Sequence, residues 1–163
     1  MQYNVNNISH FVFDEAAGAY LWYLSVPGGQ GDGPFSLENV EFELMTDRLT
    51  GEALTFENVV VMKVNHVAEN AAVTIIGLDM SFKSGNAFVF RNGQVFEVNW
   101  STAYPDYVTN RQDPLPVHFE QNGEPFPMAP GQTWFNMLNQ FDSLASIGSG
   151  IWLADFDAPA FTP

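Results

Sequence analysis

The stretch from Phe88 to Trp100 carries the side chains best suited to ligand binding in this chain. Two rings, a carboxylate and an amide lie at alternate positions within it, namely Phe88, Phe90, Glu97 and Asn99. Aromatic faces stack on the C–H surfaces of sugars, while carboxylates and amides form hydrogen bonds with hydroxyl groups. Arg91, one of five basic residues, lies between the two groups. These five residues are therefore the candidate ligand-binding set.

Other aromatic residues are more numerous than turns require, and they suggest the same sugar-binding chemistry. They are Trp22, Tyr23, Tyr104, Tyr107, Trp134 and Trp152. Aromatic side chains more often fill a core or cover a sheet edge, so both interpretations stay open.

Catalytic patterns are weak in this sequence. His10, His66 and His118 are not spaced as paired metal ligands, and a zinc site would require them to converge in space. Carboxylates are so abundant that a glycosidase-like pair has no weight without geometry. We therefore predict no catalytic residue and no enzymatic activity.

Calcium is the one cofactor that the sequence leaves open. Acidic residues in the predicted loops could join oxygen ligands, although the chain has no D-x-[DN]-x-[DN]-G loop. They are Asp14, Glu15, Asp106, Asp113, Glu120, Glu124, Asp142, Asp155 and Asp157. We otherwise expect no metal and no cofactor.

The charge balance excludes several partners. Nineteen Asp and Glu residues against five Lys and Arg residues give a formal net charge of -14, which repels nucleic-acid backbones and anionic membrane surfaces. The chain has no Cys, which excludes disulfides and thiolate metal sites. No apolar run approaches the roughly 20 residues that a spanning helix needs, and no signal-peptide pattern begins the sequence. We therefore expect neither nucleic-acid binding nor direct membrane insertion.

The candidate residues must be positioned by a hairpin, because Asn92-Gly93 is typical of a two-residue turn with positive φ at both positions. Opposed residues in such a hairpin share a face of the sheet. One face is predicted to be core, with Arg91 and Gln94 at its tip: Ala87, Val89, Phe96, Val98 and Trp100. The other is either covered by a loop or open as a ligand platform: Phe88, Phe90, Val95, Glu97 and Asn99.

Short strand-like segments recur along the chain between Gly, Pro, Asn and Asp residues, which predicts an all-β fold. We expect a twisted antiparallel sheet that is sandwich-like or open-barrel-like, with little helix. The other predicted strands are Phe11–Phe13, Ala19–Ser25, Val40–Met45, Val59–Val64, Val73–Leu78, Val117–Gln121, Glu124–Phe126, Thr133–Leu138 and Ile151–Leu153. A turn or a short helix is expected after Leu138. No long linker divides the chain, so we expect a single β domain over residues 1–163.

Four stretches in order resemble the C-terminal domain of the YerB-like bacterial lipoproteins, a family of unknown function. They are Phe11–Asp14 with Gly18, Tyr20 and Leu21; Thr50–Glu52 with Leu54 and Asn58–Val61; Gly85–Gly93 with Trp100; and Phe119 to Pro130-Gly-Gln-Thr-Trp134. The likeness covers most of residues 8–138 and leaves 139–163 as a C-terminal extension. The chain departs from the family pattern in a long Gly-rich insertion at Pro27–Pro34, and in Asn92 where Asp is usual.

The resemblance implies an extracytoplasmic, membrane-anchored or cell-envelope location in the full-length protein, and it transfers no catalytic residue. We therefore expect a non-enzymatic domain that binds a protein or glycan of the envelope. Two alternatives remain: a glycan or cell-wall hydrolase or transferase that uses carboxylates, and a purely structural support domain.

Overall fold

The computed structural model describes residues 8–26, 40–68, 76–103 and 116–154, and no helix occurs among them. This confirms the all-β class. The strands are β1 (Ser9–Asp14), β2 (Ala19–Ser25), β3 (Phe42–Leu44), β4 (Thr55–Phe56), β5 (Asn58–Ala68), β6 (Ile76–Asp79), β7 (Ser84–Arg91), β8 (Gln94–Ser101), β9 (His118–Gln121), β10 (Glu124–Pro125), β11 (Thr133–Asn139), β12 (Leu144–Gly148) and β13 (Ile151–Ala154).

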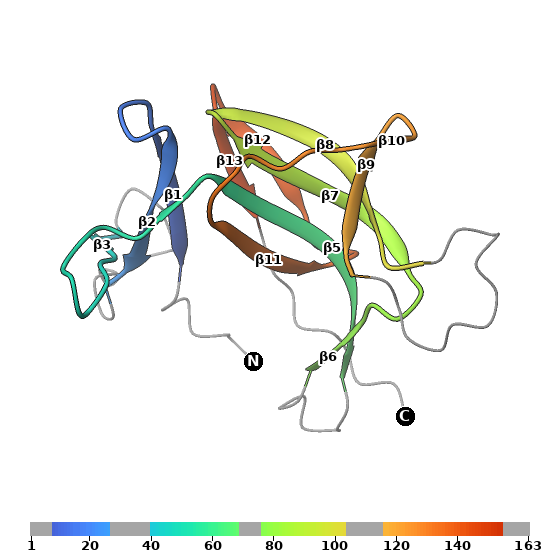
Figure 1. Ribbon diagram of the computed structural model, residues 1–163. Coiled ribbons are helices and arrows are strands. Elements are labelled where there is room, and N and C mark those ends of the chain that lie inside the picture. Colours follow the sequence, from blue (N-terminus) through green and yellow to red (C-terminus); the bar gives the residue numbers. More distant parts are fainter. Residues whose placement is uncertain (1–7, 27–39, 69–75, 104–115, 155–163) are drawn as a thin grey trace.

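The strands form a larger sheet, a smaller sheet and a hairpin (Figure 1). The larger sheet has the order β10-β9-β8-β7-β5-β11, with β6 also pairing β5. The smaller sheet has the order β1-β2-β3, with β4 also pairing β2, and β12 pairs with β13. The ladders are antiparallel, as predicted, except that β11 runs parallel to β5. The architecture is sandwich-like and not a closed barrel.

The hairpin of β7 and β8 has the predicted register, with Phe88 opposite Glu97 and Arg91 opposite Gln94. Its turn residues have positive φ, 50° at Asn92 and 69° at Gly93. Gly93 is required for a second reason, because a Cβ there would lie 2.9 Å from the Phe13 ring. The turn is therefore a contact point between the two sheets.

One face of the larger sheet, here called the core face, holds the main hydrophobic core. Its buried side chains are Val60, Met62, Val64, Ala87, Val89, Val98, Trp100 and Phe119. Trp100 is 2% exposed, and its indole Nε1 donates to the Lys63 carbonyl at 3.0 Å. Phe119 of β9 stacks on Phe135 of β11 with centroids 6.3 Å apart, so the sheet rolls around this core. The predicted core assignment of the hairpin is confirmed.

The opposite face, here called the second face, is covered at one end by the smaller sheet. Val59, Phe90 and Trp134 of the larger sheet belong to a cluster with Tyr20 and Phe56. The indole rings of Trp22 and Trp134 lie 4.6 Å apart within it. These two tryptophans therefore pack between the sheets, as their core interpretation predicts.

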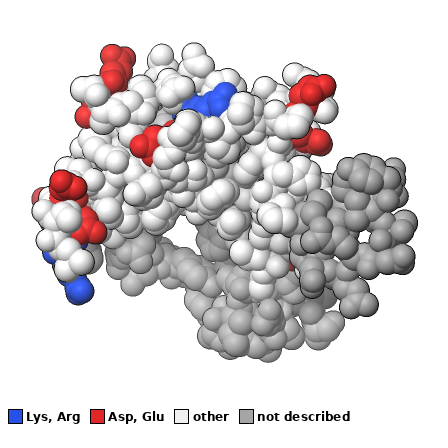
Figure 2. Space-filling view, viewed as in Figure 1, with Lys and Arg blue, Asp and Glu red and all other residues white. Residues whose placement is uncertain are grey.

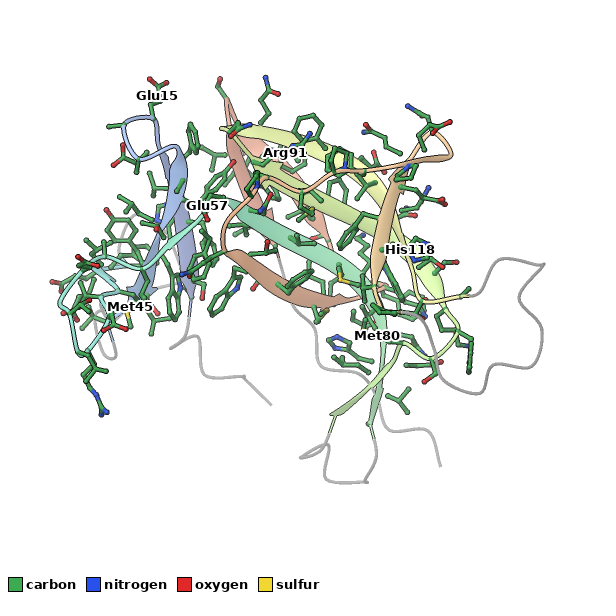
Figure 3. All side chains as sticks on the ribbon, in the orientation of Figure 1. Glu15, Met45, Glu57, Met80, Arg91 and His118 are labelled. Carbon is green, nitrogen blue, oxygen red and sulfur yellow. The ribbon has the colours of Figure 1, made fainter. Side chains whose placement is uncertain are left out.

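Two family motifs are held together by hydrogen bonds at the start of β5. The buried Asn58 side chain bonds to the Ala129 carbonyl and N–H, each at 2.9 Å, and to Thr133 Oγ1 at 3.1 Å. Glu57, where the two sheets join in Figure 3, accepts from the Gln132 N–H at 2.6 Å. A Cβ at Gly131 would clash with that carboxylate. The Asn-Val-Val-Val and Pro-Gly-Gln-Thr-Trp motifs thus have a structural role.

The segment after Leu138 forms a turn and a hairpin, so the alternative of a short helix is wrong. Asp142 Oδ2 accepts from the Asn139 N–H at 2.7 Å and closes the turn, as expected of Asn and Asp in turns. The strands β12 and β13 follow, and Figure 1 shows them behind β7 and β8. Several expectations concern segments outside the described residues: the loop at Pro27–Pro34, the strand at 73–75, Tyr104, Tyr107, and the acidic residues Asp106, Asp113, Asp155 and Asp157.

Candidate functional site

The aromatic half of the second face is covered by the C-terminal hairpin. The Trp152 ring lies 6.0 Å from both the Phe88 and Phe90 rings. Phe90 also packs against the cluster between the sheets. Two residues of the candidate set are thus half-buried beneath a protein segment, which was one of the two expected outcomes for this face.

Arg91 lies on the core face, away from the other candidate residues. Its guanidinium sits 4.8 Å from the Phe96 ring centroid and 4.4 Å from that of Phe126, and it donates to the Pro127 carbonyl (Figure 3). Through these contacts, Arg91 holds the segment that follows β10 against the hydrophobic core. The structure therefore gives Arg91 a packing role and does not bring it to Glu97 and Asn99.

Glu97 and Asn99 are exposed on the polar half of the second face. Asn99 is opposite Asn86 of β7 on one side and Glu120 of β9 on the other. Neighbouring strands lie about 4.8 Å apart, so these side chains form one row across three strands. A hollow of about 320 Å³ lies along the row, lined by Asn86, Glu97, Val98, Asn99, Glu120, Gln121 and Asn122. We call it the amide hollow.

A second hollow of about 370 Å³ lies where β5 leaves β7. β5 pairs with β7 as far as Met62 and with β6 from Asn65 onward, so the ladder forks at Lys63. The lining residues are Lys63, Asn65, Asp79, Lys83, Ser84, Gly85, Asn86, Trp100 and Gln140. We call it the fork hollow. Asn86 lines both hollows, so they adjoin.

The fork hollow concentrates positive charge in an acidic protein. Lys63 and Lys83 are the two lysines of the chain, and both line it. Lys83 Nζ lies 3.5 Å from Asp79 Oδ2, and Lys63 Nζ donates to the Asp142 carbonyl at 3.0 Å. Figure 2 shows Asp and Glu side chains in separate groups over the visible face, with few Lys or Arg side chains among them.

The three histidines lie in different surroundings. His10 packs at 5.1 Å against the Phe42 ring, His66 is buried, and His118 is exposed on β9. Burial lowers the pKa of His66, while the charge of Asp142 and a hydrogen bond to the Met137 backbone oppose that shift. Within the described ranges, no group of three or more His, Asp or Glu side chains could hold a metal ion.

Sequence reasoning found Glu97 and Asn99 but missed their neighbours. Asn86 could have been found, because the register from the Asn92-Gly93 turn puts it opposite Asn99. Lys63 and Lys83 carried no local signal, since the fork that unites them depends on the separate pairing of β5 with β6 and β7.

Residues 1–135 match the family described as "Protein of unknown function (DUF3048) C-terminal domain", and the chain belongs to that family. This confirms the resemblance seen in the sequence. Among its relatives is "Putative lipoprotein YerB" of Bacillus subtilis (strain 168), which is 26% identical over 148 residues, or 90% of this chain and 36% of that protein.

The crystal structure of the YerB protein from Bacillus subtilis shares the fold. The TM-score is 0.59 at 23% sequence identity, and the match covers 84% of this chain and 38% of that chain. The chain thus spans little more than a third of the length of these relatives. Neither the family description nor the relative's name states a catalytic activity. In the part of the chain that the structure describes, we find no helix with the length and apolarity needed to cross a membrane.

Proposed function

We propose that this chain is a non-enzymatic binding domain of a bacterial envelope protein and that its ligand is a glycan. The observation that carries the proposal is the division of the second face. Its aromatic half lies beneath Trp152 and the smaller sheet, whereas its polar half is exposed and hollowed.

The lining of the amide hollow favours a glycan over a protein. Amide and carboxylate groups predominate there, and Asn86, Asn99 and Glu120 lie in one row. An amide both donates and accepts, so a row of such groups matches the alternating donors and acceptors of sugar hydroxyls. A protein interface usually has an apolar centre with aromatic anchors, and here the nearby aromatic residues Phe88 and Phe90 are covered.

Two further observations support an envelope location. The relative that matches 90% of the chain is named "Putative lipoprotein YerB". A net charge of -14 also suits an exposed soluble domain that avoids anionic lipid surfaces.

The proposal is tested by titrating the chain with peptide-free glycan fragments of bacterial cell wall and following backbone amide NMR signals. We expect shifts in residues 97–99 and 120–122. Asn86→Ala and Asn99→Ala should each weaken binding by about tenfold, as expected when one hydrogen bond to the ligand is removed, with an unchanged thermal midpoint. Gln94→Ala, on the core-face tip, is the matched control. An unshifted amide hollow would overturn the proposal.

A carboxylate-based hydrolase is the second candidate, because Glu97 and Glu120 line the same hollow. Glycoside hydrolysis uses a pair of carboxylates across the scissile bond. Product release from the same fragments, abolished in both Glu97→Gln and Glu120→Gln, would replace the non-enzymatic proposal. Fragments recovered intact after long incubation would support the non-enzymatic proposal.

A further inference from the structure

We infer that the fork hollow is a subsite for a carboxylate group, so that the glycan bound by this domain carries one carboxylate among neutral sugar groups. The inference rests on the proposed function and adds the chemical class of the ligand. It starts from the convergence of Lys63 and Lys83 on one hollow beside the amide hollow.

The floor of the fork hollow is rigidly built. The Trp100 indole crosses beneath it and donates to the Lys63 carbonyl at 3.0 Å. A Cβ at Gly85 would lie 2.8 Å from Trp100 Nε1 and 3.0 Å from the Lys63 carbonyl oxygen. Only glycine at position 85 therefore leaves room for the hydrogen bond between Trp100 and Lys63. Because Trp100 is held within the core, the backbone that carries Lys63 is fixed at the fork.

Lys63 retains capacity for a ligand. Its ammonium group has three donors, and one contacts the Asp142 carbonyl at 3.0 Å. The Asp142 carbonyl belongs to the turn before β12, and its contact holds the Lys63 side chain on the side of the sheet where the fork hollow lies. The ammonium is therefore oriented before any ligand arrives, which lowers the entropic cost of binding.

Lys83 is paired only loosely. Its Nζ is 3.5 Å from Asp79 Oδ2, and the two side chains are 53% and 39% exposed. Exposed pairs of this kind contribute little, so a carboxylate held by both lysines can compete with Asp79 for Lys83. The Asp79 carboxylate therefore competes with the ligand carboxylate for the Lys83 ammonium group.

The surrounding charge limits what the ligand can be. Two lysines against one carboxylate make the lining locally positive, while the whole chain has a net charge of -14. A polyanion would be repelled by the rest of the surface. The fit is to a single carboxylate followed by neutral hydroxyl and amide groups, which would lie along the amide hollow.

The test compares one ligand in two forms: peptide-free cell-wall oligosaccharides that carry one carboxylate, and the same oligosaccharides with that carboxylate converted to an amide. Calorimetric titration should show the acidic form binding at least about tenfold more tightly, the effect of one charge-assisted hydrogen bond. Lys83→Gln should remove that preference. Asp79→Asn should strengthen binding of the acidic form, because it removes the competitor.

Arg48→Gln is the matched control, since it removes one positive charge from an exposed turn of the smaller sheet and should leave both affinities unchanged. Equal binding of the two forms would overturn this inference and leave the proposed function standing. Binding of neither form would overturn both. Tighter binding of a tetrapeptide with a free C-terminal carboxylate would also overturn it, in favour of a peptide ligand.

Discussion

Trp100 connects the core of the larger sheet with the fork hollow. Its ring is 2% exposed, and its N–H satisfies the Lys63 carbonyl where β5 parts from β7. Buried carbonyls need a hydrogen-bond partner, so the indole here takes the place of a neighbouring strand.

We expect Trp100→Ala to lower the free energy of unfolding by about 3–5 kcal/mol, since it leaves a large cavity and an unpaired carbonyl. Urea unfolding measures the change. Trp100→Phe retains most of the ring volume and should cost less. An unfolding midpoint that stays within error of the wild type would show that Trp100 does not support the core.

The sequence makes Arg91 a candidate ligand-binding residue, whereas the structure gives it packing contacts. Its position at a hairpin tip predicts little effect on stability, but its guanidinium contacts Phe96, Phe126 and the Pro127 carbonyl. We expect Arg91→Ala to cost about 1–3 kcal/mol, from two cation–π contacts and one charged hydrogen bond. The opposite residue provides the control: Gln94→Ala should have little effect. A cost as small as that of the control would favour the hairpin-tip interpretation instead.

Asn58 links the second and fourth of the stretches that resemble the family. Its side chain satisfies both backbone groups of Ala129 and is fully buried. Asn58→Ala should cost about 2–4 kcal/mol, because unpaired buried partners remain. The substitution Asn86→Ala, at an exposed position, should leave the free energy of unfolding almost unchanged in chemical denaturation. Similar costs at the two positions would contradict the structural role.

At the level of elements, the C-terminal hairpin decides how much of the second face is open. A two-stranded hairpin is marginal by itself in water, so β12 and β13 depend on contacts with the larger sheet. Trp152 supplies ring contacts to Phe88 and Phe90.

Trp152→Ala should therefore release the hairpin while the larger sheet stays folded. Hydrogen exchange is expected to accelerate in residues 144–154 and to remain slow in β7 and β8. Ile151→Ala, at a position 56% exposed, is the control and should leave exchange unchanged. Unaltered protection of the hairpin in Trp152→Ala would mean that other contacts hold it.

At the level of the whole molecule, acidification acts on stability in two opposite ways. Protonating carboxylates relieves the repulsion of a net charge of -14, which stabilises the compact state. Buried His66 acts the other way, because burial lowers its pKa from 6.5. The unfolded chain then binds the proton more readily, so this contribution is present above pH 6.5 and is lost as the pH falls through the folded-state pKa.

The His66 contribution can be isolated by a difference. The unfolding free energy of the wild type minus that of His66→Gln should shrink as the pH falls from about 7.5 toward 5, because only the wild type carries this titration. The repulsion effect is common to both chains and cancels. The corresponding difference for exposed His118→Gln is the control. A difference for His66→Gln that does not vary with pH would refute the assignment.

The sequence by itself was sufficient for local structure. Asn92-Gly93 predicted a turn with positive φ at both positions, and both residues have it. The register of β7 and β8 and their core face then followed, because side chains alternate along a strand with a period of two. The family was also recognisable, since its motifs encode local turns and the links around Asn58.

Only the tertiary structure decided which side chains of the second face are available. Phe88 is covered by Trp152, which is distant in the sequence. The fork hollow brings together Lys63 of β5 and Lys83, which directly precedes β7, at the point where β5 separates from β7. The parallel pairing of β11 with β5 likewise has no local signal. These contacts join residues distant in the sequence, and turn chemistry and strand periodicity act over only a few residues. The candidate site therefore emerged from how the elements pack.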